Sequence, residues 1–243
     1  MTNKDLLDIS DEIICLSLEG SKDRRKLFEK RWGDLLKNKS FRYHLSRKPT
    51  INSLNNFFNN FSNSRLSKEA HPPGFLGRWG CWLSHYEILS SCKNRGVESV
   101  LILEDDTYPN HKIINNKINS PPLDWDVIYL GSSQKDILAE YKDKETMTET
   151  TYFNPSSFYN FGGWKKVRAW GTFGMIVKNT VYDHYLKELK DYACKDSSIS
   201  TEPTADGTYY FYLWKKLSFY FNNELVLHDY SLESDIKCNE IKK

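Results

Sequence analysis

The stretch Val100-Leu101-Ile102-Leu103-Glu104-Asp105-Asp106 decides the fold, because an uninterrupted aliphatic run leads directly into consecutive carboxylates. Residues 100–103 show no polar alternation, which is typical of a parallel strand covered by helices on both faces. Ligands of open α/β sheets bind outside the carboxyl ends of the strands, so we expect these acids to face a ligand crevice. If the extended backbone continues, Glu104 and Asp106 share one side of it.

Carboxylates this close together repel one another unless solvent or a cation neutralises them. A hard divalent cation with oxygen ligands would do so, and it would also attract a phosphate-bearing substrate. The alternative is a solvated junction between a strand and a turn, because Asp is also a common turn residue. The stretch alone leaves both interpretations open.

Length and charge narrow the class of protein. A chain of 243 residues without a Pro/Gly/Ser-rich linker predicts a single domain over residues 1–243. A net charge of +2, from 34 basic and 32 acidic residues, argues against a nucleic-acid-binding surface. Residues 1–18 lack the pattern of a secretory signal, and no stretch approaches a membrane span. We therefore expect a cytoplasmic protein without an integral membrane segment.

The cysteines carry no recognisable pairing pattern. There are five of them, widely scattered and without a C-x-x-C pair. This predicts neither a disulfide framework nor a zinc site, and it favours a reducing compartment.

Strand and helix patterns alternate along the chain, as in a βαβ architecture. We expect strands at residues 12–18, 100–103, 124–131 and 169–177, and helices after Ser21, over residues 80–94 with Gly96 at the end, and over residues 179–189. Residues 209–214 and 225–228 are expected to close the ordered part of the chain. Residues 38–73 are rich in Asn, Ser and Lys and are interpreted as a variable excursion. Residues 132–166 form a long polar and aromatic segment, which predicts a lid or acceptor loop.

Several motifs occur in an order that resembles the family 25 glycosyltransferases, which include lipopolysaccharide β-galactosyltransferases and procollagen galactosyltransferases. The motifs are Leu16-Ser17-Leu18 with Asp23-Arg24-Arg25, Gly80-Cys81-Trp82-Leu83-Ser84-His85, Leu103-Glu104-Asp105-Asp106, Trp125-Asp126-Val127-Ile128-Tyr129-Leu130-Gly131, residues 171–177, Asp206, and Ser234-Asp235-Ile236. The resemblance covers most of the chain. It implies an α/β protein of the GT-A type, with an open, mostly parallel twisted sheet flanked by helices.

The resemblance also implies a reaction. Such an enzyme is an inverting, metal-dependent transferase that moves a hexose, galactose or glucose, from a UDP-sugar to a hydroxyl of a glycan or glycosylated protein, with Mn²⁺ or Mg²⁺. A divalent cation would stabilise the charge that develops on the leaving diphosphate. The alternatives are a catalytically silent carbohydrate-binding relative and a nucleotidyltransferase, although no glycine-rich phosphate loop follows the first strand.

The family pattern gives the acidic residues separate roles. Asp106 is expected to ligate the metal, and Glu104 or Asp105 to contact the ribose or assist the metal. Asp206 is the candidate general base, and its alternative is a turn residue followed by Gly207. His228, after a late strand, is a third candidate metal ligand, although the family more often has glutamine nearby.

The remaining candidates surround the first strand and the helix at residues 80–94. Ser84 and His85 are expected to orient the donor sugar or the carboxylates, while a buried core histidine is the alternative for His85. Leu18, Arg24 and Arg25 are candidates for binding the donor near the first strand. A solvated arginine at a helix start is the alternative for at least one of the two arginines.

Overall fold

The computed structural model describes residues 5–59, 74–112, 120–131, 165–166, 171–194, 213, 216–221 and 225–232. In these ranges the helices are η1 (Leu6–Ile9), α1 (Lys22–Leu36), α2 (Ile51–Asn59), α3 (Phe75–Arg95) and α5 (Asn179–Cys194). The strands are β1 (Glu12–Leu18), β2 (Phe41–Ser46), β3 (Ser99–Glu104), β4 (Thr107–Pro109), β5 (Val127–Tyr129), β6 (Lys165–Lys166), β7 (Gly174–Lys178), β8 (Phe219–Phe221) and β9 (Val226–His228).

The central sheet has the strand order β2-β1-β3-β7-β5-β8-β6, and β4 pairs with β9 separately. Strand β1 pairs in parallel with β2 and β3, and β5 pairs in parallel with β8. Strands β7 and β6 run in the opposite direction to their neighbours. Most strands therefore share one direction, which confirms the predicted α/β class with a mostly parallel sheet flanked by helices.

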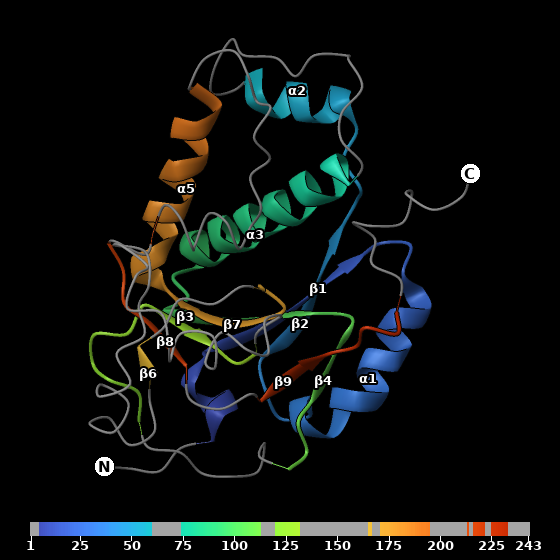
Figure 1. Ribbon diagram of the computed structural model, residues 1–243, viewed down its shortest axis with the longest axis vertical. Coiled ribbons are helices and arrows are strands. Elements are labelled where there is room, and N and C mark those ends of the chain that lie inside the picture. Colours follow the sequence, from blue (N-terminus) through green and yellow to red (C-terminus); the bar gives the residue numbers. More distant parts are fainter. Residues whose placement is uncertain are drawn as a thin grey trace, which may run out of the picture.

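Helices cover both faces of the sheet, as the aliphatic run of β3 predicted (Figure 1). Val100 and Ile102 belong to one buried cluster, which includes residues of α2, α3 and α5. Leu101 and Leu103 belong to the other, which includes residues of α1. The side chains of a strand point alternately to its two faces, so a strand buried on both sides needs apolar residues at every position.

Two details differ from the sequence prediction. Strand β3 ends at Glu104, and residues 105–106 form a turn, so the extended backbone does not continue to Asp106. The excursion at residues 38–73 contains strand β2 and helix α2, and it lies outside the described residues from 60 to 73. Its weak periodicity hid these elements because β2 is only partly buried at the sheet edge.

A close backbone contact holds β9 beside the sheet. A Cβ atom on Gly131 would collide with the carbonyl oxygen of Val226 and would lie 2.5 Å from a ring carbon of Phe173. The backbone nitrogen of Val226 also donates to the carbonyl of Leu130 at 2.9 Å. The chain therefore needs a glycine at position 131, where the backbone of Val226 approaches it. Val226 is the first residue of β9 and precedes His228 by two positions.

Within the described ranges, no helix combines the length and the apolar character needed to cross a membrane.

Candidate active site

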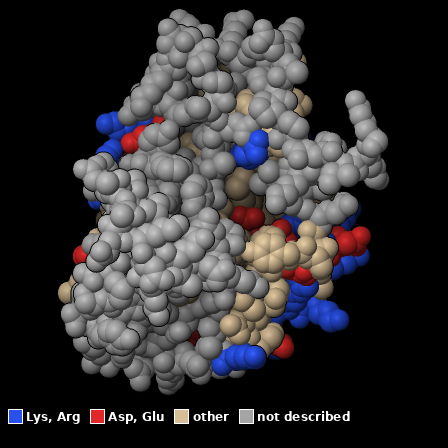
Figure 2. Space-filling view, viewed as in Figure 1, with Lys and Arg blue, Asp and Glu red and all other residues tan. Residues whose placement is uncertain are grey.

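A pocket opens where β1 and β3 end, which is the edge of the sheet predicted to bind ligand. Its lining comes from the end of β1, the first turn of α1, the loop after β2, helix α3 and the end of β3. The lining residues are Leu16, Ser17, Leu18, Arg24, Ser46, Lys48, Pro49, Gly77, Gly80, Cys81, Ser84, Glu104, Asp105 and Asp106. Figure 2 shows acidic side chains within a hollow on this side of the molecule, below a basic group.

The three acids of the quoted stretch meet in this pocket, although each has different partners. The guanidinium of Arg24 forms ion pairs with both Asp105 and Asp106, the second at 2.7 Å. The hydroxyl of Ser17 donates to the other oxygen of Asp105 at 2.6 Å. Asp105 is therefore held by a hydroxyl from β1 and a guanidinium from α1.

Glu104 is the acid whose charge is most strongly disfavoured. Burial and the nearby Asp106 carboxylate raise the pKa of Glu104 to about 7, although the hydroxyl of Thr172 opposes the shift. That hydroxyl donates to Oε1 of Glu104 at 3.0 Å. A carboxyl group with a pKa near neutrality loses its proton readily when a cation binds, because the positive charge of the cation stabilises the carboxylate.

Asp106 is ionised at neutral pH, in contrast to its neighbour Glu104. Burial alone would raise the pKa of Asp106, but His228 and Arg24 hold it below its ordinary value. Nε2 of His228 lies 3.4 Å from Oδ2 of Asp106. Burial alone would also lower the pKa of His228, but the Asp106 carboxylate raises it. Within the described part of the chain, Oδ1 of Asp106 is buried without a hydrogen-bond partner.

The two neighbouring arginines have separate roles. Arg24 lines the pocket, whereas Arg25 donates hydrogen bonds to the turn between β1 and α1. Nη1 of Arg25 donates to the hydroxyl of Ser17 at 3.0 Å and to the carbonyl of Leu18, and Nη2 donates to the carbonyl of Glu19 at 2.9 Å. Leu18 therefore lines the pocket while its carbonyl holds Arg25. Arg25 stabilises the turn that presents Arg24.

Helix α3 forms the opposite wall with small residues at helical spacing: Gly77, Gly80, Cys81 and Ser84. The hydroxyl of Ser84 donates to the carbonyl of Gly80 at 2.7 Å, so it is occupied within the helix. His85 is 0% exposed and lies behind this wall, and burial lowers its pKa to about 3. The structure thus places His85 in the core next to the site, with a neutral ring at physiological pH.

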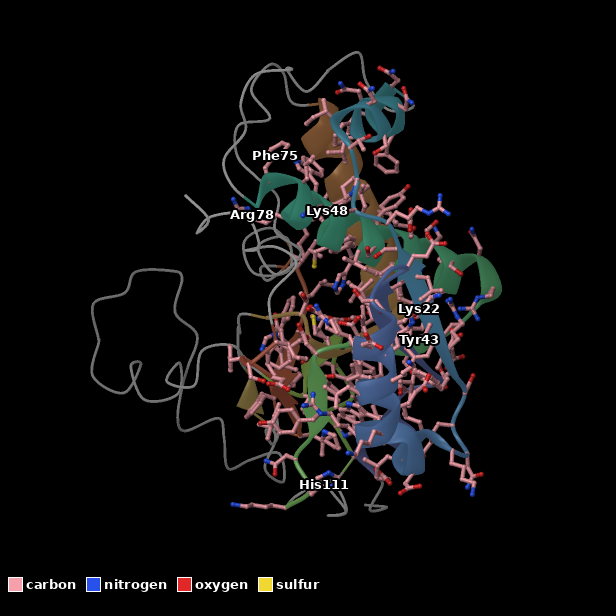
Figure 3. All side chains as sticks on the ribbon, turned by 90° about the vertical axis from the view of Figure 1, so that its right-hand side faces the viewer. Lys22, Tyr43, Lys48, Phe75, Arg78 and His111 are labelled. Carbon is pink, nitrogen blue, oxygen red and sulfur yellow. The ribbon has the colours of Figure 1, made fainter. Side chains whose placement is uncertain are left out.

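The loop after β2 approaches α3 closely and brings Lys48 to the pocket. A Cβ atom on Gly80 would lie 2.9 Å from Cδ of Pro49, so the approach depends on that glycine. Figure 3 shows Lys48 and Arg78 near the N-terminal half of α3. The pocket is therefore lined by acids and basic residues together, which suits a ligand with a diphosphate bound through a cation.

Most of the predicted site residues that the structure describes lie in or beside this pocket. The predicted Leu18, Arg24, Ser84, Glu104, Asp105 and Asp106 line the pocket, and His228 contacts Asp106. Asp206 and most of residues 132–166 lie outside the described residues. Lys48 and Thr172 were missed, because a lysine in a weakly patterned loop and a threonine before a strand carry no local signal. Ser17 does carry a local signal, since it is a polar residue between Leu16 and Leu18 in strand β1.

The comparison with protein families gives a match to the model described as "Glycosyltransferase family 25 (LPS biosynthesis protein)", over residues 10–199. The chain is 27% identical over 143 residues to procollagen galactosyltransferase 2 of Homo sapiens, covering 52% of this chain and 21% of that protein. It is 36% identical over 67 residues to procollagen galactosyltransferase 1 of Danio rerio, covering 25% and 11%.

The relatives also include a protein described as inactive. The chain is 34% identical over 79 residues to inactive glycosyltransferase 25 family member 3 of Homo sapiens, covering 30% of this chain and 12% of that protein. The matched segments thus span 11% to 21% of the length of these relatives.

Among solved structures, a glycosyltransferase involved in the glycosylation of the major capsid of PBCV-1 aligns with a TM-score of 0.48 and 12% identity, covering 91% of this chain and 93% of that one. The family match spans well over half of the chain, and residues of the first three motifs line one pocket. The chain belongs to glycosyltransferase family 25.

Proposed function

We propose that this chain is an inverting, metal-dependent hexosyltransferase that moves galactose or glucose from a UDP-sugar to a hydroxyl of a glycan or glycosylated protein. The observation that carries the proposal is the meeting of Glu104, Asp106 and Arg24 at the carboxyl end of the sheet. Family membership and the relatives named procollagen galactosyltransferases support it.

The residues of the pocket fit a hard divalent cation. Oδ1 of Asp106 is a buried oxygen without a hydrogen-bond partner among the described residues. Glu104 supplies a second carboxylate, and His228 lies against the same aspartate. Mn²⁺ and Mg²⁺ both accept such oxygen-rich ligand sets. We propose that Asp106, Glu104 and His228 hold the cation, which would stabilise the charge of the leaving diphosphate.

The chain's own residues then position the donor. Arg24 and Lys48 supply positive charge to the pocket, where phosphate oxygens of the donor would lie. Asp105, fixed by Ser17 and Arg24, is suited to accept a hydrogen bond from a ribose hydroxyl. Asp206 is proposed as the base that removes the proton from the acceptor hydroxyl.

Calorimetric titration of UDP with and without Mn²⁺ tests the donor site. Wild-type protein should bind UDP far more tightly with Mn²⁺, and Asp106→Asn should lose the metal-dependent part while remaining folded. The matched control is Asp23→Asn, because Asp23 is an exposed acid one position from Arg24, and its side chain is 97% exposed. Folded wild type that binds no UDP in the presence of Mn²⁺ would contradict the proposal.

Turnover separates an enzyme from a silent carbohydrate-binding relative, which the inactive family member makes a specific second candidate. UDP-galactose and UDP-glucose should each be incubated with Mn²⁺ and a panel of glycans, and UDP release measured. Asp206→Asn should lose turnover with UDP affinity unchanged. Tight UDP binding without any transfer would favour the silent relative.

A further inference from the structure

Two side chains of types that can ligate a metal, Cys81 and His85, lie beside the acidic cluster. Cys81 and His85 are four residues apart on α3, so they share one face of the helix. One donor atom from each of Cys81, His85 and Glu104 lies within 4.8 Å of the other two. A thiol, an imidazole and a carboxylate therefore converge between α3 and the end of β3.

We propose that Cys81, His85 and Glu104 form a binding site for a thiophilic divalent cation, Zn²⁺ foremost, with a donor set different from that of Asp106. Zn²⁺ prefers sulfur and nitrogen ligands, whereas Mn²⁺ and Mg²⁺ prefer oxygen. The sequence did not reveal the site, because its residues lie on a helix and a distant strand without a C-x-x-C pair.

The geometry suits three protein ligands and an open fourth position. Zn²⁺ bonds of about 2.0–2.3 Å place tetrahedral donors roughly 3.5 Å apart, so donor atoms that lie within 4.8 Å of one another must close by at most about 1.3 Å. Cys81 and Glu104 line the pocket, which gives them room to move and leaves the fourth position open to solvent or ligand. His85 is fully buried, so the protein fixes its ring. On binding, the thiol of Cys81 would release its proton to solvent.

Glu104 would belong to both sites, which gives the inference a consequence for the reaction. A Zn²⁺ ion held by Cys81 and His85 draws the Glu104 carboxylate toward α3 and away from Asp106. Zn²⁺ should therefore oppose the binding of Mn²⁺ and inhibit the enzyme. This consequence rests on the proposed function, whereas the Zn²⁺ site itself does not.

Cobalt substitution tests the site without any turnover. Co²⁺ added to the full chain should give a thiolate-to-cobalt charge-transfer band in the near ultraviolet, and Zn²⁺ should abolish it. Cys81→Ser should lose the band and weaken Zn²⁺ binding more than about tenfold, since even partners outside the ligand shell change affinity by 10–100-fold. Cys92→Ser is the matched control, because Cys92 is a buried thiol of the same helix that lies against Glu12.

The wild-type chain provides a second measurement that does not depend on a variant. Zn²⁺ should slow the alkylation of Cys81 by iodoacetamide, quantified by mass spectrometry, whereas Mg²⁺ should not. A cobalt band that persists in Cys81→Ser, or equal alkylation of Cys81 with and without Zn²⁺, would overturn the inference. Neither result bears on the UDP titration, so failure of the Zn²⁺ site and failure of the donor site are distinguishable.

Discussion

Nη2 of Arg24 lies 2.7 Å from Oδ2 of Asp106, which joins the first turn of α1 to the turn after β3. The same nitrogen contacts Asp105, so one guanidinium compensates two buried carboxylates. A cation that binds Asp106 must therefore share this carboxylate with the guanidinium of Arg24. Helix α1 therefore sets the charge balance of the pocket.

Arg24→Met should destabilise the metal-free protein, because it removes the guanidinium that is paired with two buried carboxylates. The expected loss in the free energy of unfolding is on the order of 3 kcal/mol, as for a broken buried ion pair. Saturating Mn²⁺ should recover part of the loss by supplying a new cation. Urea unfolding with and without Mn²⁺ measures both effects.

Arg47→Met is the control for that substitution. Arg47 pairs with Glu19 at 2.6 Å, but its side chain is 82% exposed, so solvent screens the pair. This variant should unfold like wild type. A metal-free Arg24→Met protein with wild-type stability would show that Arg24 does not compensate the acids.

Glu104 should make the metal-free protein less stable as the pH rises. Its pKa is raised to about 7 by burial and Asp106, from an ordinary 4.5. Between these values the native state binds more protons than the unfolded state, so stability falls with rising pH. Relative to Glu104→Gln, wild type should lose on the order of 2–3 kcal/mol between about pH 5 and pH 8.

The measurement is the free energy of unfolding across that range, without metal. His228, whose pKa is raised by Asp106, contributes in the same direction, because its stabilisation is lost as the pH rises through its folded pKa. Parallel pH curves for wild type and Glu104→Gln would contradict the prediction.

Glu12 should show the opposite pH dependence at the far end of β1. Burial would raise the pKa of Glu12, but Arg95 and Arg42 lower it below its ordinary value. Nε of Arg42 lies 2.8 Å from Oε1 of Glu12. The ion pairs of Glu12 therefore stabilise the folded protein above the ordinary pKa of a glutamate. This stabilisation is lost as the pH falls through the pKa of Glu12 in the folded protein.

Glu12→Gln should therefore cost about 2 kcal/mol at neutral pH, and the difference from wild type should shrink in acid. Its affinity for UDP with Mn²⁺ should equal that of wild type, since Glu12 lies at the start of β1 and the pocket at its end. Thermal unfolding at several pH values measures the stability difference, and a titration with UDP and Mn²⁺ measures the affinity. A loss of UDP affinity in the folded variant would contradict this separation.

Gly131→Ala should move β9 and weaken the proposed metal site. The new methyl group would collide with the backbone of Val226 and the ring of Phe173, and His228 is two residues beyond Val226. We expect a loss of about 1–3 kcal/mol in the free energy of unfolding, as for other overpacked sites. Mn²⁺-dependent UDP binding should weaken as well.

Gly33→Ala is the matched control for that substitution. Gly33 lies inside α1, and a Cβ atom there would meet nothing within 4 Å. Alanine should stabilise the helix by about 1 kcal/mol, because glycine is a poor helix former. Gly131→Ala with wild-type stability and UDP affinity would show that β9 tolerates the displacement.

The sequence by itself determined the central strands β1 and β3 and the identity of the acids that follow β3. The run before Glu104 is apolar at every position, and this pattern suits a strand with helices on both faces. Helix α1, the Gly96 end of α3, and strands β1 and β3 follow from equally local patterns. Residues 38–73 were less predictable, because β2 and α2 are held by contacts with distant elements.

Only the tertiary structure decided which candidates meet and in which state of charge. Arg24 and Arg25 are equivalent in sequence, but the helix turns one toward Asp106 and the other toward the backbone of Leu18. Cys81 and Glu104 are distant along the chain, yet they line the same pocket. Local sequence specifies backbone conformation and burial, whereas distances between elements, and the pKa values that depend on them, arise only when the chain packs.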